Sequence, residues 1–442
     1  MRYSLLTLLC LGSILSARAQ KFPVDTLIMN GPVDARVNLV FVGDGYQLNE
    51  LDDFIVDAKG LTDDLFAQAP FKEYRSHFNV FAISVPSNES GAALDPSKII
   101  DNYFGSTFNY AGIDRLLVVT KSNKVTSVLA NNFPEYDQVF MVVNSTKYGG
   151  SGGWIATSSV HQSAGEIAIH EMGHSFADLR DEYWAGQQYA LEKANMSQTN
   201  NPKTVRWKNW IQIDNVGVYP YTSSGVGSDW YKPHQACKMQ LLGVDFCPVC
   251  KETITEKVLS ITEPIVSFTP STDSIVDFED TMTFSVDLLE PDPNTIKVDW
   301  KLGSVAMPEG QKLKLRRADL SQDTSKVTAT VFDETPFSKK DDATTYRRYT
   351  INWEVVKATS TKVLPPTVTE QRLTVYPNPG TSYIAIDGLE NLAELRVLDM
   401  AGHEVIAPYI GNQLDISGLQ AGVYVLQASV DGQVLQHQFV KR

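Results

Sequence analysis

Two histidines four residues apart enclose a glutamate within residues 168–183, in an apolar setting typical of a helix. Residues i and i+4 of an α-helix lie on one face about one turn apart, so His170 and His174 can bind one ion. A tetrahedral zinc ion accepts two imidazole nitrogens at about 2.0–2.1 Å and leaves room for a third protein ligand and a water. Glu171 is placed to take a proton from that water and to pass it to a leaving amine. The pattern predicts a zinc peptidase centre, and a solvated helix with two hydrogen-bonded histidines is the plainer alternative.

The elements around this motif predict how it is positioned. Ser163 is a candidate N-cap, and Glu166 three residues later completes the spacing of a capping box at the start of the helix. A strand expected over residues 139–143 leads toward this helix through the glycine-rich stretch 147–153. Such a strand edge can hold a substrate backbone by strand addition, although a flexible connector would have the same composition.

The first part of the chain alternates apolar runs with a helix-like segment. An amphipathic pattern predicts a helix over residues 51–66, and runs rich in β-branched residues predict buried strands. Besides the strand at 139–143, these are expected at 37–43, 78–85 and 116–120. Strands that alternate with helices indicate an α/β layer.

The first 20 residues have the pattern of a secretory signal peptide. Arg2 forms a short basic head, residues 5–15 are apolar, and residues 17–19 are an Ala-Arg-Ala cleavage site, so removal of residues 1–19 is expected. Cys10 lacks the setting of a lipoprotein cysteine, and no later stretch reaches the roughly 20 apolar residues of a membrane helix. We therefore expect export through a cleaved signal peptide, without a lipid anchor or a membrane span.

The composition is that of a folded protein with about three domains. The 442 residues are 43% hydrophobic and 10% aromatic, which is ordinary for chains that bury apolar cores. The formal net charge of −14 is spread along the chain without an acidic block. This argues against nucleic acid and anionic membranes as partners. The pattern indicates no particular oligomeric state.

Three cysteines remain after removal of the signal peptide: Cys237, Cys247 and Cys250. An exported protein reaches a compartment that permits disulfides. One local bridge is expected, from Cys237 to one of the other two, and it leaves one thiol over. A Cys-x-x-Cys zinc half-site is the alternative, and the missing second Cys-x-x-Cys argues against it.

From about residue 263 the pattern changes to short alternating strands separated by polar turns. Five such runs predict a β-sandwich of immunoglobulin type over residues 263–357: 265–268, 282–288, 296–300, 327–332 and 349–356. Residues 358–371 are rich in Thr, Lys and Pro and predict a linker. A second β module is expected over residues 372–442. The catalytic residues are therefore expected in a domain over residues 20–262.

Residues 170–183 resemble the motif of the IgA Peptidase family of bacterial metallopeptidases, His-Glu-x-x-His followed by a short spacer and Leu-x-Asp-Glu-Tyr. The similarity extends over about residues 24–260 and includes Val-Asn-Leu-Val-Phe-Val-Gly-Asp-Gly-Tyr at 37–46 and Phe-Cys-Pro-Val-Cys at 246–250. It implies a metzincin-like zinc endopeptidase, in which two histidines and an acidic residue bind the metal and the glutamate acts as base. The expected fold class is an α/β metzincin-like zinc peptidase domain followed by two all-β sandwich-like modules.

The third metal ligand is expected in the Asp-Glu-Tyr of this motif. The metzincin position six residues after the second histidine holds Arg180, which cannot ligate zinc. Asp181 is the first choice, Glu182 is the alternative, and His234 is a more distant candidate. Tyr183 is a candidate phenol donor to the oxyanion of the reaction, with plain packing as the alternative.

Met239 lies some 65 residues after the predicted metal helix, where a metzincin would place the methionine turn beneath the metal. A methionine that only fills space in the core is the alternative.

The end of the chain resembles the C-terminal sorting domain of type IX secretion substrates. The similarity covers about residues 372–442 and rests on four stretches: Val-Tyr-Pro-Asn-Pro at 375–379, Asp-Met-Ala-Gly-His-Glu-Val at 399–405, Leu-Gln-Ala-Gly-Val-Tyr-Val at 419–425, and the terminal Phe-Val-Lys-Arg. It implies a location at the cell surface or beyond, or in the periplasm if the host has no such exporter.

Together these features predict a secreted zinc-dependent endopeptidase that hydrolyses protein or glycoprotein substrates, such as host glycoproteins or immunoglobulin. His170, His174 and Asp181 would hold Zn²⁺, and Glu171 would act as general base and acid. A surface protein that binds protein or glycan and retains the metallopeptidase fold is the alternative, and a metal-dependent hydrolase of other bonds is a third class. The intact Glu171 favours the peptidase, because a lapsed site would be free to lose its base.

Overall fold

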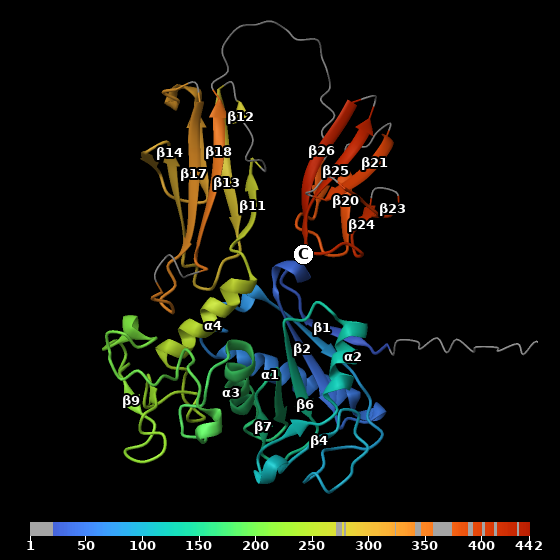
Figure 1. Cartoon of the computed structure of the whole chain (residues 1–442), viewed down its shortest axis with the longest axis vertical. Coiled ribbons are helices and arrows are strands. Elements are labelled where there is room, and N and C mark those ends of the chain that lie inside the picture. The colour runs from blue at the N-terminus through green and yellow to red at the C-terminus, as the bar shows by residue number, and fades with distance from the viewer. Residues whose placement is uncertain are drawn as a thin grey trace, which may run out of the picture. The chain divides into compact units, whose positions relative to one another are not determined.

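The structure is a computed structural model of the chain. It describes residues 21–270, 276–277, 280–322, 324–340, 346–356, 374–387, 392–399, 403–410, 413–430 and 433–442. The predicted signal peptide and the linker expected over 358–371 lie outside these residues. The chain divides into two compact units, Met1–Ala358 and Thr359–Arg442. Figure 1 shows their strands and helices coloured by position in the sequence.

A six-stranded mixed sheet lies at the centre of the first unit's N-terminal part. Its strand order is β1-β3-β2-β6-β8-β7. The four inner strands are parallel, and the two edge strands are antiparallel to their neighbours: β1 (Val24–Ile28), β3 (Phe78–Ile83), β2 (Val37–Asp44), β6 (Gln138–Val143), β8 (Ile155–Ser159) and β7 (Gly150–Ser151). The inner strands are buried along their whole length. This burial explains why the predicted strands have continuous apolar runs and no alternation.

Helices cover both faces of this sheet (Figure 1). On one face, Leu39 and Phe41 of β2 share a core with α1 (Leu51–Ala67), α3 (Ala164–Ala177) and α4 (Pro248–Ile261). On the other face, Val40 and Val42 share a core with α2 (Ser122–Asn132). Successive strand residues point to opposite faces, so one apolar strand supplies both cores. Loops with one short ladder, β9 (Tyr219–Pro220) and β10 (Tyr231–Lys232), connect α3 to α4.

The predicted strand at residues 116–120 is not part of this sheet. Within it, Val118–Val119 (β5) pairs with Ser106–Thr107 (β4) in a separate two-stranded ladder. Leu116 makes one isolated parallel bridge to Gly150 of the edge strand β7. Leu117 is fully buried in the core on the α2 face. A short apolar run does not distinguish a sheet strand from a partly buried connecting segment.

The described residues between 265 and 356 form two sheets around one apolar core. The sheets have the orders β11-β13-β16 and β12-β18-β17-β14-β15: β11 (Ile265–Thr269), β13 (Thr281–Leu288), β16 (Lys312–Arg316), β12 (Val276–Asp277), β18 (Arg348–Val356), β17 (Thr324–Asp333), β14 (Ile296–Leu302) and β15 (Val305–Met307). Trp300 and Trp353 stack in the core with ring centroids 5.7 Å apart. The hydroxyl of Tyr74 donates to Asp333 Oδ2 at 2.7 Å, which ties these sheets to the N-terminal part of the same unit.

The described residues of the second unit form two four-stranded sheets around a core of their own. Their orders are β19-β20-β24-β23 and β22-β21-β25-β26: β19 (Thr374–Tyr376), β20 (Tyr383–Asp387), β24 (Gln413–Asp415), β23 (Tyr409–Ile410), β22 (Glu404–Val405), β21 (Leu392–Asp399), β25 (Gly422–Val430) and β26 (Gln433–Lys441). Counted over the described residues, the chain is rich in β-strands and has few helices. None of the helices described is long and apolar enough to cross a membrane.

Candidate metal centre

Helix α3 carries both predicted histidines, and its start differs from the prediction. Ser163 occupies the N-cap position with φ −100° and ψ 18°, and its side chain makes no capping hydrogen bond. A capping side chain needs an extended backbone at this position, so the predicted capping box is wrong. The carboxylate of Glu166 instead accepts hydrogen bonds from Lys238 Nζ and from the backbone N–H of Gly243. The helix start is therefore attached to the loop that contains the cysteines.

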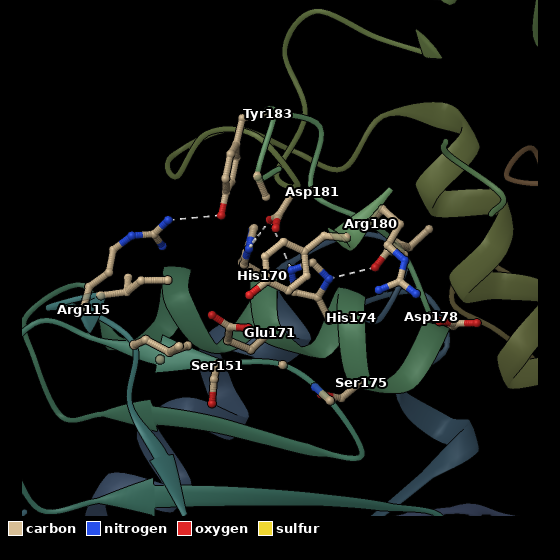
Figure 2. A pocket seen from close by; sticks show the side chains of 18 of the residues that line it. Arg115, Ser151, His170, Glu171, His174, Ser175, Asp178, Arg180, Asp181 and Tyr183 are labelled. Atoms are coloured by element: carbon tan, nitrogen blue, oxygen red, sulfur yellow. Dashed lines mark hydrogen bonds and ion pairs between the residues drawn. The ribbon is translucent and has the colours of Figure 1, made fainter. Parts of the chain in front are cut away.

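The end of α3 turns the chain back toward the histidines. Asp178 has the left-handed conformation, with φ 53° and ψ 32°, which short polar side chains tolerate better than other non-glycine residues. Its N–H donates to the carbonyl of His174 at 3.0 Å, and the N–H of Leu179 donates to that of Gly173 at 3.1 Å. This reversal brings Asp181 beside the two imidazole rings (Figure 2).

His170, His174 and Asp181 converge on one point (Figure 2). The Nδ1 atoms of His170 and His174 lie 2.9 Å and 2.7 Å from the carbonyl oxygens of Lys238 and Leu179. A carbonyl oxygen only accepts, so each Nδ1 carries a proton and donates it, and each neutral ring offers the lone pair of its Nε2. The two Nε2 atoms lie 3.3 Å and 3.2 Å from Asp181 Oδ1.

The Nε2 atoms of His170 and His174 and the Oδ1 of Asp181 all present lone pairs to one another, so a positive charge is needed between them. Asp181 Oδ1 is buried and has no donor when both Nε2 atoms are unprotonated. In the metal-free chain a proton fills this role: burial acts to lower the pKa of His174, but the hydrogen bond and charge of Asp181 outweigh it and raise that pKa to about 9. Two imidazole nitrogens and one carboxylate oxygen are also a donor set that zinc accepts at catalytic sites. The residues present therefore fit Zn²⁺.

The other candidate ligands lie away from this point. Glu182 is fully buried, and its Oε1 lies 3.2 Å from Cys250 Sγ. The ring of His234 is half-buried and contacts the carbonyl oxygens of Ala236 and Asp214, at 2.5 Å and 3.2 Å. Among the described residues, Asp181 is thus the carboxylate that the fold places beside the histidine pair.

Glu171 lines the same cavity as the histidines, and this cavity has a volume of about 600 Å³. The residue is only 7% exposed. Burial raises the pKa of its carboxyl group, although the nearby His170 and His174 act in the opposite direction. A carboxyl whose pKa is raised toward neutrality is suited to taking up a proton and giving it back.

Arg115 is a cavity residue that the sequence did not indicate. Its Nη2 donates to the hydroxyl oxygen of Tyr183 at 3.1 Å, and its guanidinium lies 5.8 Å from the centre of that ring. Burial and the charge of Asp181 raise the pKa of Tyr183 to about 12, so the phenol keeps its proton at neutral pH. No motif marks Arg115, because it precedes an apolar run in an ordinary polar turn.

Met239 is fully buried against α3. A Cβ built on Gly173, between the two histidines, would lie 2.5 Å from the Sδ of Met239. The carbonyl of the preceding Lys238 receives the hydrogen bond from His170. The side chain of Met239 therefore packs directly against α3, and the carbonyl of the residue before it orients the ring of His170.

The glycine-rich stretch approaches α3 closely. A Cβ on Gly152 would lie 2.4 Å from the Cβ of His174. The backbone of Gly150 is already paired, because its N–H donates to the carbonyl of Arg115 at 3.2 Å and its carbonyl accepts from Leu117 at 3.4 Å. Strand addition at Gly150 would therefore have to displace residues 115–117, although β7 is an edge strand of the sheet.

Replacement of Gly152 by alanine should lower the free energy of unfolding by about 1–3 kcal/mol, the usual cost of overpacking, and should also reduce any activity of the site. The added methyl group would force apart the loop and the helix that carries His174. Gly60→Ala in α1 is the matched control, because nothing lies within 4 Å of its Cβ position. It should stabilise the helix by about 0.5–1 kcal/mol. Thermal unfolding of both variants checks this, and equal effects would contradict the close approach.

Comparison with known proteins relates the N-terminal part of the first unit to a peptidase family. Residues 26–226 match the family model for IgA Peptidase M64, and residues 374–442 match that for the secretion system C-terminal sorting domain. The chain thus carries an M64 peptidase domain and a type IX secretion sorting domain, which confirms both resemblances over the matched residues. The similarity expected for residues 227–260 lies outside the match. The sorting domain marks a secreted or cell-surface protein. The M64 match ends before Cys237.

Comparisons with individual proteins are much weaker. No curated protein matches the chain. A solved structure of Dscam aligns at 10% identity and a TM-score of 0.14, covering 40% of this chain and 46% of that one. A quinoprotein alcohol dehydrogenase-like protein from Bacteroides thetaiotaomicron aligns at 12% identity and a TM-score of 0.15, covering 38% and 35%. The chain spans less than half the length of either structure, and these TM-scores carry no argument.

Proposed function

We propose that this chain is a secreted zinc-dependent endopeptidase with a metzincin-like catalytic domain in residues 20–262. One observation carries the proposal: the Nε2 atoms of His170 and His174 and the Oδ1 of Asp181 converge in the cavity that Glu171 lines. The M64 match supports peptide bonds as the target. In this proposal residues 263–357 are an immunoglobulin-like module, residues 358–371 a linker, and residues 372–442 the sorting module.

The chain's own residues have distinct roles in this reaction. His170, His174 and Asp181 would hold a zinc ion, which would supply a Lewis acid for the scissile carbonyl and for the attacking water. Glu171 takes the proton from the attacking water and delivers it to the leaving amine. Lys238 and Leu179 fix the imidazole tautomers through their carbonyls, and such contacts orient ligands and raise their basicity.

Tyr183 is the proposed donor to the oxyanion that forms at the attacked carbonyl. Its phenol remains protonated at neutral pH because burial raises its pKa to about 12. Arg115 donates to the phenol oxygen, which holds the ring at the cavity wall and makes its hydroxyl a stronger donor. A donor fixed in a partly buried site stabilises developing negative charge more than water does.

Protein or glycoprotein substrates, including host glycoproteins and immunoglobulin, are the proposed targets. The sorting domain supports a substrate outside the cell. The cavity also has an aromatic wall, in which Trp154 and Tyr189 are each about half exposed. Exposed aromatic side chains beside a reaction centre favour substrates with apolar residues near the cleaved bond.

Cleavage mapping tests the function directly. The purified chain is incubated with a peptide library and with intact immunoglobulins, and cut sites are mapped by mass spectrometry. We expect cleavage that stops with a chelator and returns with Zn²⁺. Zinc-loaded protein that cuts none of these substrates would instead favour the alternative of a surface protein that binds protein or glycan.

Tyr183→Phe should lower kcat by about 10²–10³-fold, the usual cost of losing one oxyanion donor, with a smaller change in KM. Tyr189→Phe is the matched control, because it removes one hydroxyl from another tyrosine of the same cavity and keeps the aromatic ring. Steady-state kinetics on a peptide from the cleavage map measures both. If kcat is unchanged in Tyr183→Phe, the ring only packs.

A further inference from the structure

A second group of metal-ligating side chains lies next to the candidate metal centre. Cys237, Cys247, Cys250 and Glu182 are all buried, and their ligand atoms lie within 4.8 Å of one another. No disulfide joins the three cysteines, all of which are described. The predicted bridge is therefore absent, and the M64 match does not reach these cysteines.

Three of the distances within this group are close to the edges of a tetrahedral metal site. With Zn–S bonds of about 2.3 Å and Zn–O bonds of about 2.1 Å, a tetrahedron has S···S edges of about 3.8 Å and S···O edges of about 3.6 Å. The sulfurs of Cys237 and Cys250 are 3.7 Å apart. Glu182 Oε1 lies 3.7 Å from Cys247 Sγ and 3.2 Å from Cys250 Sγ.

Glu182 gives an independent sign that a cation belongs here. Its side chain is fully buried, and its Oε2 has no hydrogen-bond partner. Its Oε1 accepts from Asn195 Nδ2 at 3.2 Å and also contacts the thiols of Cys247 and Cys250. A buried carboxylate with an unsatisfied oxygen is costly unless it is paired or coordinates a metal.

We propose that Cys237, Cys247, Cys250 and Glu182 form a second, structural zinc site. Four protein ligands close a tetrahedral site and leave no position for water or substrate, which distinguishes structural from catalytic zinc. Three thiolates and one carboxylate exceed the charge of Zn²⁺ by two. The amine of the buried Lys232, which donates to the carbonyl of Glu182 at 2.6 Å, offsets part of this excess.

The fold supplies the local features that such a site needs. Cys247 is the N-cap of α4, Pro248 follows at its first position, and Cys250 lies in its first turn. The N-terminal end of a helix carries partial positive charge, which stabilises thiolates. The N–H of Cys247 also donates to Cys237 Sγ at 3.2 Å, the kind of contact that orients a metal ligand.

This site would hold together the segments that build the catalytic centre, and this consequence rests on the proposed function. Glu182 follows Asp181 directly, and its N–H donates to the carbonyl of Met239 at 2.8 Å. Cys237 precedes Lys238, whose carbonyl receives the hydrogen bond of His170. A metal bound by Glu182 and Cys237 would therefore fix the adjacent residues Asp181 and Lys238, both of which contact the histidines. Glu182 thus acts as a positioning residue.

Two other roles for these cysteines fit the structure less well. A disulfide needs sulfurs about 2.05 Å apart, and a bridge from Cys237 to Cys250 would leave Cys247 and Glu182 buried without a cation. A redox-active Cys-x-x-Cys needs an accessible thiolate, but Cys247 is 3% exposed and Cys250 is fully buried.

Metal and thiol counts on the full chain, expressed with Zn²⁺ and purified without chelator, test the proposal. Elemental analysis should find two zinc ions per chain in the wild type, one in the His170→Ala/His174→Ala double variant, and one in Cys247→Ser. The Co²⁺-substituted double variant should keep an intense thiolate-to-metal charge-transfer band, and Cys247→Ser should lose it. After denaturation with chelator and without reductant, three thiols should react in protein that starts at residue 20, because the fourth cysteine, Cys10, lies in the predicted signal peptide.

Each other result has a definite meaning. A count of one reactive thiol would show a disulfide and overturn the structural site. A count of three thiols with only one zinc ion, which the histidine double variant loses, would also overturn it. A single zinc that the histidine variant keeps and the cysteine variant loses overturns the proposed function and leaves this site standing. If Cys247→Ser does not fold, Glu182→Gln replaces it: all thiols remain, and zinc should transfer to a chelator about 10–100-fold faster, as expected when metal affinity falls by that factor. Unchanged transfer would remove Glu182 from the site.

Discussion

Glu171→Gln should reduce peptide cleavage by about 10²–10⁴-fold, the range typical of a lost general acid–base group, while the zinc content stays that of the wild type. Glutamine has nearly the same size and fits the same buried space, but it cannot take a proton from water. Because His170, His174 and Asp181 remain in place, the donor set beside it is intact. Values of kcat/KM together with elemental analysis measure both effects.

Glu354→Gln is the matched control, because it makes the same chemical change at an exposed position of β18 and should leave kcat/KM unchanged. Retained cleavage in Glu171→Gln would show that the base lies elsewhere. Loss of zinc in this variant would show that Glu171 is a ligand.

Asp181→Ala should weaken zinc binding at the histidine pair by more than about 100-fold, since outer contacts alone are often worth about 10–100-fold. Removal of the carboxylate takes away one of three donors and the negative charge that faces both imidazoles. Competition with a chelator measures the affinity, and cleavage should be lost in parallel.

Glu182→Ala separates the two candidate ligands. It should leave the histidine pair able to bind zinc, because Glu182 contacts the cysteines and not the imidazoles. If Glu182→Ala alone empties the histidine site, the assignment of the third ligand to Asp181 is wrong.

The helix of the candidate site could be predicted from the sequence because its signal is local. A spacing of four residues places His170 and His174 on one helix face, and α3 (Ala164–Ala177) contains both. The apolar runs at 37–43, 78–85 and 139–143 lie in β2, β3 and β6. Because both faces of these strands are buried, most of their residues are apolar, and the sequence shows this directly.

Other parts of the site depend on contacts between distant segments. Cys237, Cys247 and Cys250 are close in sequence, but Glu182 lies more than fifty positions earlier, so the pattern favoured a disulfide. Arg115 reaches Tyr183 across 68 positions. The capping box failed for a related reason, because Glu166 is held by Lys238 from a distant loop.

The left-handed turn at Asp178 also constrains how this segment can change in length. It sets the direction of the chain so that two consecutive carboxylates face opposite ways, Asp181 toward the imidazoles and Glu182 toward the thiols. A deletion or insertion of one residue between Asp178 and Asp181 would present the wrong carboxylate to each cluster. The number of residues between Asp178 and Asp181 is thus more restricted than the types of those residues. Homologous chains should differ in the types of residues 179 and 180 before they differ in this spacing.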